Sequence, residues 1–132
     1  MPIVRQEFTG RFNRIVEAGG HVFLSGVVAR DATGDIRAQT LDVLQQIDDL
    51  LAKAGASKSA IVSANIWLSD IGLIQAMNDV WDQWVDIDHA PVRATVESRL
   101  ARPDLLVEIQ VQAFRDQLEA RRAAGPNRGG RQ

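Results

Sequence analysis

The stretch "DIRAQTLDVLQQIDDLLAKAGAS", residues Asp35–Ser57, decides most of the fold, because its apolar residues recur at the spacing of an α-helix. The residues expected on the buried face of this helix are Thr40, Leu41, Leu44, Ile47, Leu50, Leu51 and Ala54. Lys53 places a cation in the last turn, and Gly55 supplies the residue that a left-handed cap favours. The stretch therefore predicts an amphipathic helix packed by one face against another layer.

A second helix is predicted over residues 71–85, where large apolar residues again share one face. These residues are Leu73, Met77, Val80, Trp81 and Trp84. Ser69 or Asp70 can cap the first turn, and Pro91 lies beyond the end of the helix.

The remaining regular segments alternate with a period of two, which is typical of strands. They are "HVFLSG" (21–26), "IVSANIWL" (61–68), "VRATVE" (92–97) and "LVEIQVQAF" (106–114). A further strand precedes a hairpin turn at Gly19–Gly20. The order strand, strand, helix, strand, helix, strand, strand predicts an α+β domain with two helices on one face of a mixed sheet.

The segment "HAPVRATVE", residues 89–97, raises the question of which side of its strand is buried. We expect Val92, Ala94 and Val96 to pack under the helices and Arg93, Thr95 and Glu97 to point to the other face. With these three, the other face is expected to carry Ser25, Trp67, Glu108 and Gln110. This mixture is too polar for a core and too apolar for open water, so it indicates a subunit interface with polar pockets.

Composition narrows the class of protein. The 132 residues correspond to one domain, expected over residues 1–115, followed by a basic, disordered tail over 116–132. The chain has no cysteine, so it offers neither disulfides nor thiolate chemistry. It contains no long apolar run and begins without a secretory pattern, so we expect a cytoplasmic protein without membrane contact. The net charge of −2 gives no general attraction to nucleic acid, and the tail is too short to predict such a partner.

Motifs for phosphate, dinucleotide, metal or serine-nucleophile chemistry are absent from the sequence, so no cofactor or metal is expected. Arg93 and Glu108 carry more information. If their strands pair as a hairpin, both side chains share one face, where an arginine fork binds a carboxylate and a glutamate orients water or moves protons. The alternative is a cross-strand ion pair on an exposed sheet, and spacing alone favours that interpretation.

The segment "PVRATVESRLARPDLLVEI", residues 91–109, resembles the signature of the RidA (YjgF) family. The matching positions are Pro91, Arg93, Val96, Ala101, Val107, Glu108 and Ile109. The likeness extends over nearly the whole chain to about Phe114, and "AMNDVWDQW" (76–84) is similar to the YoaB-like branch.

The resemblance implies a homotrimer with a chorismate-mutase-like fold, in which the sheets form a central barrel and the sites lie between subunits. It implies cofactor-free hydrolysis of reactive imines and enamines to 2-keto acids and ammonia. By the same resemblance, Arg93 holds the substrate carboxylate, Glu108 positions or activates water, and Ser25 and Asn78 lie near the site. Asn78 could equally be a structural or solvated helix residue, and the Ser25 hydroxyl could instead bond nearby backbone.

Two positions depart from the family pattern. Phe12 stands where the archetype has tyrosine, and Thr95 stands where it has cysteine. Both are expected to line the substrate pocket. The predicted function is hydrolytic deamination of 2-imino and enamine acids. The alternatives are a non-catalytic binding protein for small carboxylates and, ranked last, a protein-binding or RNA-associated role of the tail.

Overall fold

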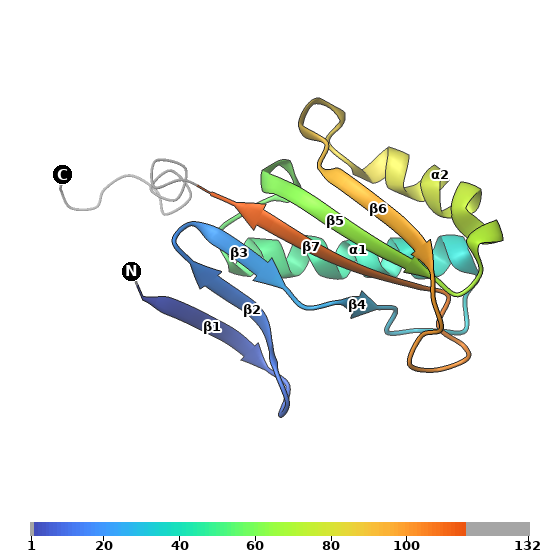
Figure 1. Ribbon diagram of the computed structural model, residues 1–132, viewed down its shortest axis with the longest axis horizontal. Coiled ribbons are helices and arrows are strands. Elements are labelled where there is room, and N and C mark those ends of the chain that lie inside the picture. Colours follow the sequence, from blue (N-terminus) through green and yellow to red (C-terminus); the bar gives the residue numbers. More distant parts are fainter. Residues whose placement is uncertain (1, 116–132) are drawn as a thin grey trace.

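The computed structural model describes residues 2–115 and contains two α-helices on one face of a mixed β-sheet (Figure 1). The strands are β1 (Ile3–Phe8), β2 (Asn13–Ala18), β3 (His21–Leu24), β4 (Val27–Val28), β5 (Ile61–Leu68), β6 (Val92–Glu97) and β7 (Val107–Phe114). The helices are α1 (Ile36–Lys53) and α2 (Ile74–Trp84). The predicted α+β class is confirmed. The tail predicted over 116–132 lies outside the described residues.

The last strand of the sheet lies at its centre. The strand order is β1-β2-β3-β7-β5-β6, with the short β4 also paired to β7. Strands β5 and β6 are parallel, and every other pair is antiparallel. β5 therefore separates β6 from β7, so the hairpin considered for these two strands does not form.

The core lies between α1 and the sheet. Leu44, Ile47 and Leu51 of α1 are fully buried, as predicted. The prediction for Leu41 is wrong: its side chain is 49% exposed, and Val43 takes its place in the core. Gly55 has φ +72°, which confirms the left-handed cap.

Helix α2 is held over β6 by contacts with α1. A single turn of 3₁₀-helix precedes it, and the Asp70 carboxylate caps that turn by accepting a hydrogen bond from the Gly72 N–H at 2.8 Å. Arg37 of α1 forms an ion pair with Asp79 at 2.7 Å, and the Trp84 indole N–H donates to Asp48 at 3.0 Å. These contacts fix which side chains of α2 face the edge strand.

A buried glutamine of α1 ties two loops to the helix. The Gln39 side-chain amide donates to the carbonyls of Ala32, Gly34 and Asp104, and its oxygen accepts from the Leu106 N–H at 2.9 Å. Gln39 is 0% exposed, although its residue type is mostly found at the surface. One side chain thus anchors the ends of both the β4–α1 and the β6–β7 loops.

Two strands were missing from the sequence prediction. β1 is largely exposed and does not alternate, and β4 has only two residues. The turn at Gly19–Gly20 is confirmed, with φ values of 58° and 88°. Neither helix of the described part is long and apolar enough to cross a membrane.

Candidate active site

The polar side of β6 faces the helices. In the parallel β5–β6 register, Arg93 lies opposite Ala64 and Thr95 lies opposite Ile66. Side chains directly opposite one another share a face of the sheet, and both partners on β5 are buried on the helix side. Val92 is 73% exposed on the other face. The expected orientation of this strand is therefore wrong, and α2 supplies partners for its polar side chains.

Arg93 packs on an aromatic ring of α2. Its Cζ lies 5.2 Å from the centroid of the Trp81 ring, within the range of a cation–π contact. Burial of the guanidinium lowers the pKa of Arg93 from its ordinary value, and the charge of Asp82 opposes this shift.

Asn78 and Thr95 lie within the same layer, between two contacts that β6 makes with the α2 region. Arg93 stacks on Trp81 at one end, and the Glu97 carboxylate accepts from the Ile71 N–H at 2.9 Å at the other. The Asn78 Oδ1 and the Thr95 Oγ1 are buried, and neither has a hydrogen-bond partner among the described residues. A buried polar atom left unpaired costs about 1–3 kcal/mol, so such atoms commonly mark a functional site.

Glu108 lies on the opposite face of the sheet. It pairs with Trp67 on β5 and with Val28 on β4. A Cβ atom placed on Gly26 would overlap the Glu108 carboxylate, so a larger residue there would displace that side chain. The adjacent Ser25 Oγ is buried and has no partner among the described residues, so the alternative of a hydroxyl bonded to nearby backbone is not observed.

Arg93 and Glu108 do not meet within one chain. Arg93 shares a face with Ala64 and Glu108 shares a face with Trp67, and these two β5 residues are an odd number of positions apart. Neither a cross-strand ion pair nor a common pocket in a single chain is therefore possible. The two side chains can act on one small ligand if different copies of the chain contribute them.

Phe12 lies at the tip of the β1–β2 hairpin and is 51% exposed. Phe8, at the end of β1, is 68% exposed. In its own chain Phe12 is thus an exposed aromatic residue at a hairpin tip, a position from which it can contact another molecule.

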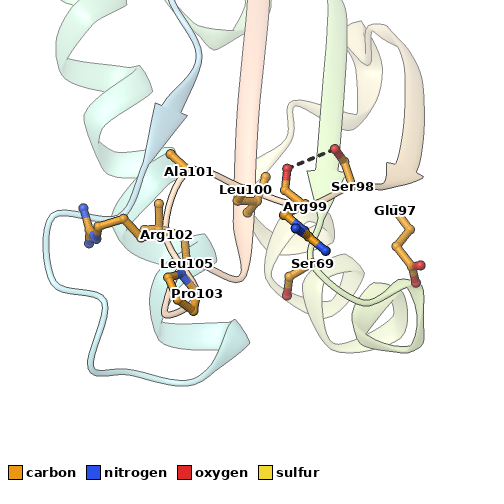
Figure 2. Close-up of a pocket in the computed structure, with 9 residues that line it drawn as sticks. All are labelled: Ser69, Glu97, Ser98, Arg99, Leu100, Ala101, Arg102, Pro103 and Leu105. Atoms are coloured by element: carbon orange, nitrogen blue, oxygen red, sulfur yellow. Dashed lines mark hydrogen bonds between the residues drawn. The ribbon is translucent and has the colours of Figure 1, made fainter.

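The sequence analysis missed a half-open cavity of about 800 Å³ in the β6–β7 loop (Figure 2). Its lining residues are Ser69, Glu97, Ser98, Arg99, Leu100, Ala101, Arg102, Pro103 and Leu105. None of the predicted site residues lines this cavity. In residues 2–115, no three histidine, aspartate or glutamate side chains converge in a way that could hold a metal ion.

Comparison with known proteins places the chain in a family. The model of the family described as Endoribonuclease L-PSP matches residues 4–115. The chain belongs to this family. The RutC family protein YoaB of Escherichia coli is 40% identical over 113 residues, which cover 86% of this chain and 98% of YoaB. A RutC family protein of Haemophilus ducreyi is 39% identical over 111 residues, which cover 84% and 95% of the two chains.

Solved structures of the Endoribonuclease L-PSP family have the same fold. A YjgF family member from Neisseria meningitidis superposes with a TM-score of 0.85 at 44% identity, covering 88% of this chain and 98% of that one. A member of the YjgF/YER057c/UK114 family from Mycobacterium tuberculosis gives a TM-score of 0.77 at 31% identity, covering 86% and 99%. The resemblance to the RidA (YjgF) family is thereby confirmed.

Proposed function

We propose that the protein hydrolyses reactive 2-imino and enamine acids to 2-keto acids and ammonia, in a pocket completed by two subunits of a homotrimer. The observation that carries the proposal lies in the layer between β6 and α2, which also holds Arg93: the Asn78 Oδ1 and the Thr95 Oγ1 are buried there without a partner among the described residues, and the Arg93 guanidinium is partly buried. A small ligand with a carboxylate and an adjacent polar group would satisfy all three.

In the proposed mechanism, Arg93 orients the substrate and Glu108 transfers protons. The Arg93 fork holds the carboxylate and thereby fixes the neighbouring C=N carbon. Glu108 of another subunit accepts a proton from water as the water oxygen bonds to that carbon, and returns a proton to nitrogen. The carbinolamine then loses ammonia: its C–N bond breaks, the C=O bond forms, and the hydroxyl proton passes through Glu108 to the leaving nitrogen. An enamine enters the same route after tautomerising to the imine.

Exposed apolar side chains support assembly of the chain with other copies. Val92 on the edge strand is 73% exposed and Val96 is 48% exposed, and Phe23 on the same open face is 38% exposed. Apolar surface gathered on one sheet face favours an interface between subunits. Phe12 offers such a pocket an apolar contact without a hydroxyl donor, so we expect a preference for imines with apolar side chains.

The test is release of 2-keto acid from imines made in situ by an amino acid oxidase, with semicarbazide as the competing trap. The unmodified protein should accelerate release, and Arg93→Ala and Glu108→Ala should each lose about 100-fold or more in rate. No turnover of any imine, together with carboxylate binding that needs Arg93, would instead support the non-catalytic binding protein. Unchanged turnover in Arg93→Ala would contradict the proposal.

Gly26→Ala probes the position of Glu108 without changing its chemistry. The added methyl group occupies the space of the carboxylate, so Glu108 must move. We expect kcat to fall about tenfold or more, because a displaced base transfers protons poorly. Carboxylate binding measured by calorimetry and the thermal unfolding midpoint serve as controls for the fold. An unchanged kcat would show that this contact does not matter for turnover.

A further inference from the structure

We infer that Trp81 is the residue that positions Arg93 for carboxylate binding, an inference that rests on the proposed function. Arginine has a long, flexible side chain that loses rotamer entropy when it is fixed. The Trp81 ring lies under the guanidinium at 5.2 Å, and Trp81 itself is only 6% exposed. The buried Trp81 ring therefore restricts the Arg93 side chain, which would otherwise move in solvent.

The contact holds Arg93 without occupying its hydrogen-bond donors. Among residues 2–115, no carboxylate lies within ion-pair distance of Arg93, and Asp82 acts on it through charge alone. An ion pair would fill the N–H fork that a substrate carboxylate needs. A cation–π contact with a ring supplies no carboxylate oxygen, so N–H donors of the guanidinium remain available to a substrate carboxylate.

The packing around Trp81 keeps this platform in place. Its ring contacts Trp84 at a centroid distance of 5.3 Å, and α2 is fastened to α1 by the Arg37–Asp79 ion pair. Met77, one turn earlier on the same face of α2, is 0% exposed. The position of the ring, and hence of the guanidinium above it, is therefore set by buried packing, and the exposed Arg37–Asp79 ion pair adds a link between α2 and α1.

The test separates the ring face from the size of the side chain. Trp81→Phe keeps an aromatic face, whereas Trp81→Leu and Trp81→Met remove it. Calorimetric titration with 2-oxobutanoate should give a Kd close to that of the unmodified protein for Trp81→Phe and about tenfold weaker for the two others. In turnover, the loss should appear mainly in KM. Gln83→Leu is the control, because Gln83 is on the same helix and is exposed; its Kd should stay unchanged.

A second measurement does not depend on the stability of the leucine variant. In Arg93→Ala, added guanidinium ion should restore part of the 2-oxobutanoate binding by occupying the place above Trp81. In Arg93→Ala/Trp81→Met it should restore none. Equal rescue in both proteins, or equal Kd values for the phenylalanine and methionine variants, would overturn the inference. If Arg93→Ala itself binds like the unmodified protein, the proposed function fails instead.

Discussion

A one-to-one mixture of Arg93→Ala and Glu108→Ala chains, unfolded and refolded together, is expected to recover about one quarter of the unmodified activity, although each variant alone is inactive. The reason is the placement of Arg93 and Glu108 on opposite faces of the sheet. If each site takes Arg93 from one subunit and Glu108 from its neighbour, random assembly gives one quarter of the sites both unmodified residues. The readout is 2-keto acid release in the semicarbazide assay.

The controls for this experiment are each variant refolded alone, and the two variants mixed without unfolding. Both should remain inactive as long as subunits do not exchange. No recovery after joint refolding, with normal oligomers by gel filtration, would contradict a site shared between subunits. Recovery would also establish that the minimal active species contains more than one chain.

Gln39→Leu is expected to lower the free energy of unfolding by about 3 kcal/mol. Leucine fills a similar volume but leaves the carbonyls of Ala32, Gly34 and Asp104 and the Leu106 N–H without their partner. Urea denaturation followed by circular dichroism measures the change as a shift in the midpoint at a constant slope.

Gln45→Leu is the matched control, because Gln45 lies on the same helix and is exposed. It should change the unfolding free energy by less than about 0.5 kcal/mol. Equal effects of the two substitutions would show that the buried hydrogen bonds of Gln39 contribute no more than a surface amide does.

Most of the fold could be predicted from periodicity, because α1, β5 and β7 each bury one complete face. Leu44 and Ile47 of α1 and Ile109 of β7 are fully buried, as their spacing indicates. β1 escaped prediction because most of its residues are exposed, so no alternation marks it. The role of Gln39 could not be predicted, because the sequence pattern of a helix does not distinguish a buried side-chain amide from one at the surface.

Candidate residues for the site could be named from the sequence, but their arrangement could not. The family signature named Arg93 and Glu108, yet alternation in β6 suggested the wrong buried side. A strand at the edge of a sheet can direct polar residues toward the helix layer when a helix supplies partners, and Trp81 and the Ile71 N–H do so here. Pairing of β5 with β6 in parallel requires the crossover through α2, and a single sequence does not distinguish that connection from a hairpin.

The central place of β7 has a consequence for biosynthesis. Strands β3, β4 and β5 all pair with residues 107–114. Until these residues have been synthesised, the edges of the three strands that pair with β7 have no partner. The sheet can form completely only after β7 has been synthesised. Pairings between strands that are far apart in the sequence make folding slow. Until then the edges of β3 and β5 that pair with β7 are open to association with other nascent chains.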